Sequence, residues 1–381
     1  MGLQRMRRPT QAAGPPQFVM RELEREHIER YLQQVVGKDV TLLAIVPLGE
    51  APSDGAALKA YGYGKPLRID YRVAGERRSA VFHTMAPNCF GHEFPSDRAQ
   101  ALLWAHSAYN HLPRHVGSLD VGAFKADGTL ASLGSTGEFF QITEYAEGRG
   151  YNEDLARLCD GGKLRHLDCD RADALCDYLL EIHSRPGPDP GLYTRRIREL
   201  LGHGECIMGL IDSFPHHPAV PASVLEEIER LCVQWRWKIK GLQHRLRQVH
   251  GDFHPWNILF SDGTEFRVLD RSRGEWGDPA DDVTCITANY LFFSLRRSDR
   301  LEGPLGALFA NFWRRYLSGS GSREILSVAA PFFAFRGLVL ASPVWYPQLS
   351  DSIRSKILRF VINVLRQDAF DPSEVNKYLE S

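Results

Sequence analysis

The sequence lacks an excess of charge of either sign, and it lacks a long uninterrupted hydrophobic run. Its 46 Lys and Arg residues nearly cancel its 47 Asp and Glu residues, which leaves a formal net charge of −1 with His neutral. Proteins that bind nucleic acid or an anionic membrane usually carry a basic excess, so we expect neither partner. The most apolar stretch, residues 326–345, contains Arg336, Pro331 and Pro343, which favours a buried helical region over a membrane span.

Paired cysteines are also missing. The seven cysteines are dispersed and none forms a CxxC motif, which is typical of reduced thiols and predicts a cytoplasmic protein. The first 18 residues are basic but lack the apolar centre of a signal peptide, so we expect residues 1–20 to form a flexible tail. Hydrophobic residues make up 43% of the 381-residue chain, enough for a core, and this length predicts two domains.

The hydrophobic pattern of residues 21–146 predicts a small antiparallel sheet accompanied by helices. We expect a helix over residues 22–36, strands over 41–48, 67–73 and 78–84, a helix over 96–110 and a strand over 138–143. The turn residues Ala74-Gly75-Glu76 and Asp127-Gly128 mark two hairpins. A glycine-rich loop over residues 49–65 separates the first two strands.

Residues 147–381 are predicted to be mainly helical. We expect helices over residues 170–183, 194–201, 223–246, 279–295, 304–317, 323–340 and 351–365, with a strand-like pair near 257–270. The third of these begins with a capping box, Ser223 to Glu226. Arg336 interrupts a nearly apolar helix, so we expect either a buried acidic partner for it or a contact with an anionic group.

The most informative segment runs from His250 to Asp270. Residues 258–260 and 266–269 are apolar, and Asp262-Gly263 between them is typical of a turn. If the chain folds about the midpoint of residues 263 and 264, Asn257 opposes Asp270 at one end of a hairpin. Directly opposed residues have Cβ atoms about 5 Å apart, which suits an amide oxygen and a carboxylate that share a hard cation such as Mg²⁺.

Asp252 lies on the loop that leads into this end of the hairpin, five residues before Asn257. It can face the same cavity without binding the metal, and there it can orient a hydroxyl group and accept its proton. One orienting carboxylate with two metal-holding groups suits phosphoryl transfer, which depends on positioning and charge neutralisation more than on covalent chemistry.

Three motifs of this region resemble those of the aminoglycoside phosphotransferase and choline kinase branch of the protein-kinase-like fold. They are H-G-D-x-x-x-x-N at residues 250–257, Asp270 on the next strand, and G-D-P-x-x-D at residues 277–282. The resemblance implies a two-lobe α+β fold, with a small antiparallel sheet in a nucleotide-binding N-lobe (21–146) and a mainly helical C-lobe (147–381). It also implies a kinase that uses ATP and Mg²⁺ to phosphorylate a hydroxyl group of a small molecule.

The same resemblance implies roles for individual residues. Asp252 is the catalytic carboxylate, Asn257 and Asp270 hold Mg²⁺, and the adenine of ATP lies against the backbone near Glu144 and Ala146.

Two further residues are expected to support the catalytic loop. His250 braces it through hydrogen bonds, and Asp282 either ties its helix to the loop or is a solvated acid in the first helical turn. Asp278 before Pro279 is typical of a helix N-cap.

The chain departs from the family pattern on the third strand. Kinase-like enzymes usually carry a Lys there that binds phosphates, whereas His83 occupies this place. Glu93 or Asp97 on the following helix would keep the imidazole of His83 protonated. Two alternatives are that Lys65 reaches the phosphates instead, or that His83 is a half-buried strand residue without a role in binding.

A second departure follows Asp270, where Arg271 and Arg273 lie beside the predicted metal site. Arginine forks suit phosphate or carboxylate groups, so these residues are candidates to replace the missing Lys or to bind an anionic substrate. The alternative is that they form structural salt bridges to Asp278, Asp281 or Glu275. His254 and Trp256 are candidates to line the acceptor pocket, and Trp256 is equally suited to core packing.

Two other functions compete with a small-molecule kinase. A nucleotide-binding pseudokinase with a regulatory role would account for the missing Lys, although the groups for metal and hydroxyl binding are retained. A protein kinase is disfavoured by the short catalytic loop and by the absence of an A-P-E segment. The sequence leaves open the acceptor, the choice between ATP and GTP, and the oligomeric state.

Overall fold

The computed structural model describes residues 24–48 and 66–380. The chain divides into two compact units, Met1–Thr143 and Glu144–Ser381, and each is described by itself. The tail expected over residues 1–20 and the glycine-rich loop over 49–65, which includes Lys65, lie outside the described residues. No helix in the described ranges has both the length and the hydrophobicity needed to cross a membrane.

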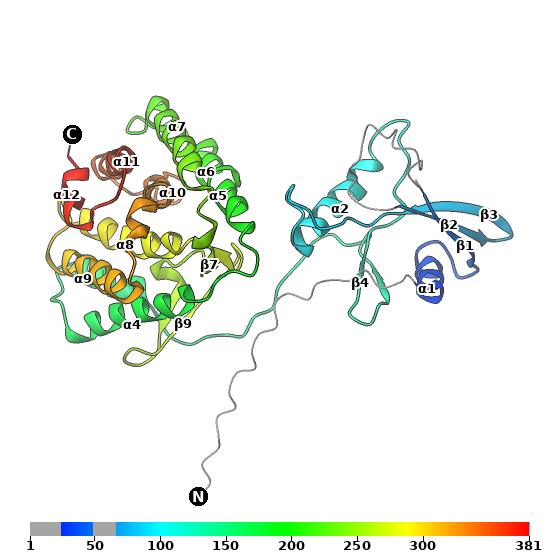
Figure 1. Cartoon of the computed structure of the whole chain (residues 1–381), viewed down its shortest axis with the longest axis horizontal. Helices are drawn as coiled ribbons and strands as arrows, with labels where there is room; N and C mark the ends of the chain where they lie inside the picture. Colours follow the sequence, from blue (N-terminus) through cyan, green and yellow to red (C-terminus); the bar gives the residue numbers. More distant parts are fainter. Residues whose placement is uncertain (1–23, 49–65, 381) are drawn as a thin grey trace, which may run out of the picture. The chain divides into compact units, whose positions relative to one another are not determined.

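The N-terminal unit contains a three-stranded antiparallel sheet in the order β1-β2-β3 (Figure 1). The elements are α1 (Arg25–Val35), β1 (Thr41–Pro47), β2 (Leu67–Val73) and β3 (Glu76–Phe82). The turn between β2 and β3 is Ala74-Gly75, with φ values of 49° and 82°, the positive values that two-residue hairpin turns require. The core of this unit is formed by Ile28, Leu32, Val40, Leu42, Ile69 and Tyr71.

The same unit continues with α2 (Pro95–Tyr109) and a second hairpin, β4 (Gly122–Phe124) and β5 (Leu130–Ser132). This hairpin turns at Asp127-Gly128, as predicted, with a φ of 88° at the glycine. The strand predicted over residues 138–143 is wrong, because this segment pairs with no strand of the described chain. Its apolar residues suit a strand, but a strand forms only where a neighbour accepts its backbone hydrogen bonds.

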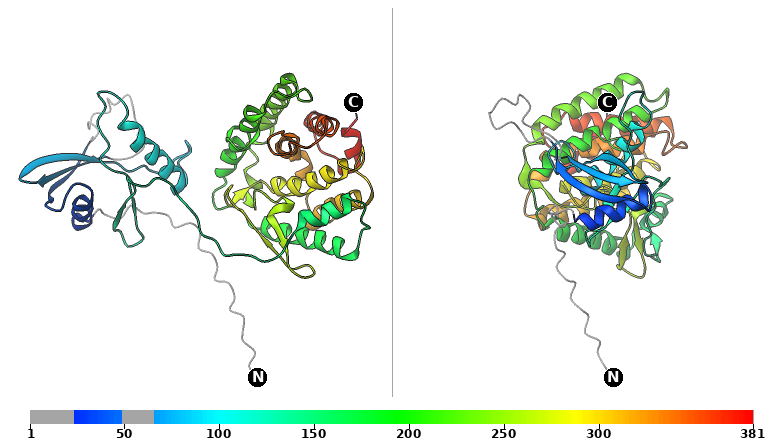
Figure 2. Two further views of the ribbon diagram at one scale, coloured as in Figure 1. Left: turned by 180° about the vertical axis from the view of Figure 1, so that it is seen from behind. Right: turned by 90° about the vertical axis from the view of Figure 1, so that its right-hand side faces the viewer.

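The C-terminal unit is mainly helical, and α8 lies inside it (Figure 1, Figure 2). Nearly every residue of α8 is buried, and the helix packs against α3, α4, α9 and α10. The helices are α3 (Tyr151–Cys159), α4 (His166–His183), α5 (Leu192–Gly202), α6 (Ile207–Ser213), α7 (Ala222–Ile239), α8 (Pro279–Leu295), α9 (Gly303–Ser320), α10 (Ala329–Ala341), α11 (Asp351–Leu365) and α12 (Val375–Tyr378).

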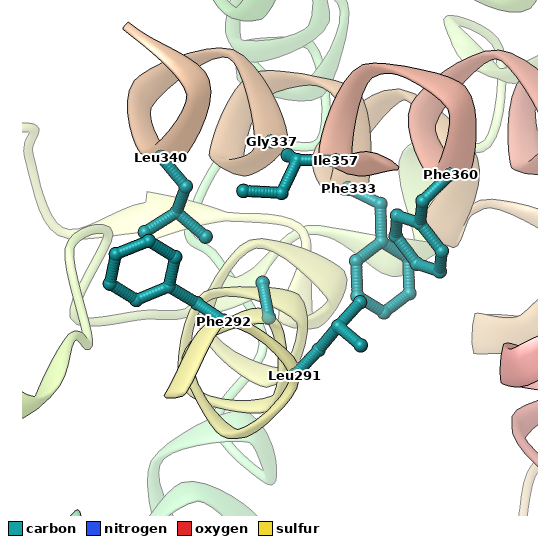
Figure 3. A pocket seen from close by; sticks show the side chains of 8 residues that line it. Leu291, Phe292, Phe333, Gly337, Leu340, Ile357 and Phe360 are labelled. Carbon is teal, nitrogen blue, oxygen red and sulfur yellow. The ribbon is translucent and has the colours of Figure 1, made fainter. Parts of the chain in front are cut away.

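Helices α10 and α11 approach each other closely at Gly337. A Cβ atom added there would lie 2.3 Å from Cγ2 of Val361 on α11. Figure 3 shows Gly337 and Phe333 of α10 near Ile357 of α11, around an apolar cavity of about 10 Å³. A cavity of this size has room for one water molecule at most. The tight packing therefore holds α10 in one position relative to α8 and α11.

Short strands in the C-terminal unit form two small sheets. One has the order β6-β8-β9 and the other pairs β10 with β7. The strands are β6 (Arg149–Gly150), β7 (Arg247–Gln248), β8 (Ile258–Phe260), β9 (Phe266–Val268) and β10 (Trp276–Gly277). The segment that carries the sequence motifs runs between β7 and α8, so these strands and the N-terminus of α8 determine its path.

Most helix predictions agree with the structure, but the bounds of two helices differ. The helix expected over residues 223–246 is α7, which ends at Ile239, and its N-cap is Pro221 rather than a capping box at Ser223. The chain then passes through the 3₁₀ turn η1 (Gln243–Arg245) into β7, which has to be extended to pair with β10. The helix expected from residue 323 is divided into η3 (Glu324–Ser327) and α10.

Candidate active site

The hairpin of β8 and β9 forms as predicted, but its register differs by one residue. Ile258 pairs with Val268, and the backbone N–H of Leu269 donates to the carbonyl of Asn257 at 2.8 Å. The expected pairing of Asn257 with Asp270 is therefore wrong. The loop contains three residues, 262–264, because the Ser261 N–H donates to the Glu265 carbonyl, and it is centred on residue 263 rather than between 263 and 264.

Asp270 lies one residue beyond this pairing, and its backbone has an unusual conformation. Its φ is 53°, in the left-handed region that residues other than Gly adopt at a cost. One carboxylate oxygen, Oδ1, accepts a hydrogen bond of 3.2 Å from the backbone N–H of Ser272. Strained residues of this kind occur where the surrounding fold requires a particular side-chain direction, and they cluster at functional sites.

Asn257 is joined directly to the preceding loop. It ends the 3₁₀ turn η2 (Pro255–Asn257), and its side-chain Nδ2 donates to the backbone carbonyl of Asp252 at 3.1 Å. This bond uses the donor side of the amide and leaves the oxygen side for another ligand. Amide and carboxylate oxygens are ligands that Mg²⁺ prefers, so Asn257 and Asp270 fit that ion. The described residues contain no group of three or more His, Cys, Asp and Glu that could hold a metal.

The Asp252 carboxylate is bound by an arginine from α10. Nη1 of Arg336 donates to Oδ1 of Asp252 at 2.6 Å, which confirms the expectation that Arg336 has a buried acidic partner. The second partner of Arg336 is Asp281, at 2.5 Å. Burial raises the pKa of Asp252, but Arg336, Arg273 and His254 together lower it further, so this pKa lies below its usual value. Asp252 is therefore ionised at neutral pH.

Two more groups lie near the other oxygen of this carboxylate. Nε2 of His254 is 3.6 Å from Oδ2 of Asp252, and Nε of Arg273 is 4.0 Å from it. Burial lowers the pKa of His254, although the charge of Asp252 opposes this change. The Arg273 guanidinium also lies over the ring of Phe335, 4.8 Å from its centroid. These groups surround Oδ2 at distances longer than hydrogen bonds to it.

Arg271 has a different environment from Arg273. Its guanidinium donates to the backbone carbonyls of Val249 and Glu275, so it joins the residue before the loop of residues 250–257 to the residue before β10. The salt bridges considered in the sequence involve other arginines, since Asp278 pairs with Arg245 and Asp281 pairs with Arg336.

Asp282 and His250 form hydrogen bonds with the backbone of the loop. The Asp282 carboxylate accepts hydrogen bonds from the backbone N–H groups of His250 and Gly251 and lies 3.1 Å from Nε2 of His183. Burial raises the pKa of Asp282, but the hydrogen bond with His183 and the nearby charges lower it further, so the net direction is downward. Nδ1 of His250 accepts from the backbone N–H of Asp252 at 3.3 Å. Asp278 is the N-cap of α8, as predicted.

The residues expected on the nucleotide side are distributed between both units. His83 is exposed and follows the last residue of β3, so it lies just beyond the strand on which it was expected. Asp97 belongs to the first turn of α2 and accepts a hydrogen bond from the backbone N–H of Phe94. Glu144 and Ala146 lie before β6 in a segment without regular secondary structure.

The chain has an antiparallel sheet in its first unit and a mainly helical second unit. In the second unit a loop, a hairpin and a helix follow one another, an order that characterises an α+β enzyme of the protein-kinase-like fold. The model of the phosphotransferase enzyme family matches residues 92–324, which is more than half of the chain. The chain belongs to this family.

Solved structures with similarity to this chain include several kinases. A glucosamine kinase (crystal form A) is 21% identical over 56% of this chain and 56% of that chain, with a TM-score of 0.31. A choline kinase from Streptococcus pneumoniae is 12% identical over 89% and 98%, with a TM-score of 0.34. An amicoumacin kinase is 12% identical over 92% and 96%, with a TM-score of 0.40. The chain thus spans little more than half the length of the first of these. No curated protein matches the chain.

Proposed function

We propose that this enzyme transfers the γ-phosphoryl group of ATP, in the presence of Mg²⁺, to a hydroxyl group of a small molecule. The observation that carries the proposal is the link between the loop and the hairpin. Asn257 binds the backbone of Asp252 and pairs with Leu269, so Asp270 follows at the same end of the hairpin. Three oxygen-bearing side chains are thereby brought to one end of a short, hydrogen-bonded segment.

Asp252 is the group that we assign to the acceptor hydroxyl. Its carboxylate is ionised and has a lowered pKa, which makes it a weak base and a strong hydrogen-bond acceptor. Its main contribution is to orient the hydroxyl oxygen toward the phosphorus atom and to accept the proton as the new bond forms. Orientation of this kind is a large part of catalysis in phosphoryl transfer.

Asn257 and Asp270 are the residues that would hold Mg²⁺. When bound, the ion neutralises charge on the phosphate oxygens of the nucleotide. The hydrogen bond from the Ser272 N–H to Asp270 and the hydrogen bond from Asn257 to the loop restrain the two side chains before any ion binds. Fixed oxygen ligands favour binding because little ordering remains to be done.

Binding of the nucleotide and of the acceptor is assigned to further residues of the chain. We assign the adenine to the backbone of Glu144 and Ala146, and the phosphates to His83 or Lys65. On the acceptor side we assign His254 and Arg273. Arg271 is a weaker candidate than Arg273, because its guanidinium already binds backbone carbonyls.

An acceptor screen with γ-labelled ATP tests the proposal. Amino alcohols, sugars, aminoglycosides and nucleosides form the panel, and Asp252→Ala is the blank. We expect label in at least one small molecule with the wild type and Mg²⁺, and none with the blank or with excess EDTA. Label in an added protein but not in any small molecule would indicate a protein kinase. Binding of ATP without turnover, with and without Mg²⁺, would indicate a pseudokinase.

We also propose a cytoplasmic location. All seven cysteines are free thiols, and five of them are buried, as expected for a protein from a reducing compartment. Fractionation of the native host would test this.

A further inference from the structure

Arg336 is the residue outside the recognised motifs that contacts the catalytic loop most directly. It lies in the middle of α10, and its side chain is 6% exposed. Nη1 donates to Oδ1 of Asp252 at 2.6 Å, and Nη2 donates to the carbonyl of Gly251 at 2.9 Å. Nη2 also bonds Asp281 in the first turn of α8. One planar group therefore binds the side chain of Asp252, the backbone before it, and a second helix.

The guanidinium has little freedom to move. It lies over the ring of Phe335, 4.3 Å from the centroid. The helix that carries it is packed tightly against α11 at the next residue, Gly337. Because a guanidinium is planar and its donors have fixed directions, these contacts also fix the rotation of the Asp252 carboxylate.

The two carboxylate oxygens of Asp252 consequently have different hydrogen-bond partners. Oδ1 accepts the short hydrogen bond from Arg336. Among the described residues, the nearest charged groups to Oδ2 are at longer distances, His254 at 3.6 Å and Arg273 at 4.0 Å. The oxygen with spare capacity to accept a hydroxyl hydrogen bond is therefore Oδ2.

We infer that Arg336 is a positioning residue for phosphoryl transfer, which holds Oδ1 of Asp252 so that Oδ2 faces the acceptor hydroxyl. This inference rests on the proposed function, because it assigns Asp252 to the acceptor. Asp281 holds Arg336 through a hydrogen bond to its guanidinium. The first turn of α8 thus fixes the loop twice, through Asp282 to the backbone and through Asp281 and Arg336 to the carboxylate.

Replacement of Arg336 with Lys tests the inference. Lys keeps the charge but presents a single ammonium group, which cannot bond Asp252, Gly251 and Asp281 in one plane. We expect kcat for Mg-ATP turnover to fall about 10- to 100-fold, the cost of a small misplacement of a reacting group. The KM for ATP should stay within about twofold, since Arg336 contacts neither predicted metal ligand and acts on the acceptor side. Water serves as the acceptor in this assay if no better one is known.

Arg245→Lys is the matched control. Arg245 is another buried arginine, and it bonds both oxygens of Asp278 at 2.7 Å, at the N-cap of the same helix α8. It does not contact Asp252. Both variants are expected to lower the unfolding temperature, but only Arg336→Lys should lower kcat. An equal fall of kcat in the two variants would overturn the inference, because it would attribute the loss to general destabilisation.

The double variant Asp252→Asn, Arg336→Lys separates positioning from any independent role. If Arg336 acts through Asp252, its replacement lowers the residual rate of Asp252→Asn by no more than about twofold. If Arg336→Lys lowers the residual rate of Asp252→Asn by the same factor as it lowers the rate of the wild type, the inference is overturned. If the wild type itself shows no turnover, the proposed function fails rather than this inference. If Arg336→Lys does not fold, Asp281→Asn replaces it in the test. A lower kcat with an unchanged KM for ATP would then support the inference, and an unchanged kcat would overturn it.

Discussion

The Asp282 carboxylate accepts a hydrogen bond of 2.8 Å from the backbone N–H of His250, and a second of 2.8 Å from the next residue, Gly251. Asp282 is completely buried in the first turn of α8. Gly251 has a φ of +87°, so the chain turns sharply and both N–H groups point to one acceptor. The helix terminus thereby determines the path of the chain immediately before Asp252.

Replacing Asp282 with Ala should destabilise the protein strongly. The N–H groups of His250 and Gly251 and the ring of His183 would lose their shared acceptor. Each unsatisfied buried group costs about 1–3 kcal/mol, so we expect the free energy of unfolding in urea to fall by about 3 kcal/mol or more. Asp177→Ala is the control, because Asp177 pairs with Arg315 at the surface and should cost about 1 kcal/mol or less. Similar losses in both variants would contradict the anchoring role.

Replacing Gly337 with Ala should also destabilise the protein, through overpacking. The added methyl group would lie 2.3 Å from Cγ2 of Val361, and overpacked cores lose about 1–3 kcal/mol. Gly202→Ala in α5 is the matched control, since nothing lies within 4 Å of the Cβ position there, and helical Ala is favoured over Gly. Thermal unfolding should show a lower midpoint for the first variant and an unchanged or higher one for the second. Val361→Ala in the same chain should restore part of the loss.

The pH dependence of stability should reveal the buried pair of Asp278 and Arg245. Burial raises the pKa of Asp278, but the charge and hydrogen bonds of Arg245 lower it further, so the folded pKa is below the usual value. This stabilisation is complete above the unfolded pKa of about 3.9 and is lost as the pH falls through the lower folded pKa. In Arg245→Met only the hydrogen bonds from Tyr193 and Ala280 oppose the burial effect. The folded pKa is therefore higher than in the wild type, and less stability is gained as the pH rises above about 4.

Urea unfolding between about pH 3 and about pH 6 measures this difference. The free energy lost in Arg245→Met should be smallest at the acid end and should grow with pH to about 3 kcal/mol or more. A loss that is constant across this range would show that the pair does not control the titration of Asp278.

Local signals predicted α8 well, whereas the capping box at Ser223 did not mark the N-cap of α7. The expected range of α8 matches the observed one because Asp278-Pro279 marks its start within the sequence itself. The register of the β8–β9 hairpin was missed by one residue. Asp262-Gly263 marks a turn but not its length, and the hydrogen bond between Ser261 and Glu265 shows that the loop has three residues, 262–264.

For long-range contacts, the sequence predicted the type of partner but not which residue it is. An arginine in an apolar helix indicates a buried acid, but it does not indicate which one, and Arg336 binds a carboxylate 84 residues away. The role of Asp281 depends on the same packing of α10 against α8. The strand expected over residues 138–143 failed for a similar reason, because strand formation depends on a partner that the local pattern does not contain.

Replacing Asp270 with Asn should raise the Mg²⁺ concentration needed for turnover. The change keeps the size of the side chain and the left-handed backbone that Asn tolerates, but it removes one negative charge from a predicted ligand. We expect the half-saturating Mg²⁺ concentration to rise about tenfold or more. Asp262→Asn in the exposed turn of the same hairpin is the control and should leave it unchanged. Equal Mg²⁺ requirements in both variants would remove Asp270 from the metal site.

The central claim is that Asp252 acts in phosphoryl transfer while Asn257 and Asp270 bind the metal that accompanies the nucleotide. The most direct test measures both steps in Asp252→Asn, with calorimetric titration for Mg-ATP binding and labelled ATP for transfer. The account predicts a dissociation constant within about threefold of the wild type and a transfer rate at least about 100-fold lower. A variant that transfers phosphate at the wild-type rate would contradict it.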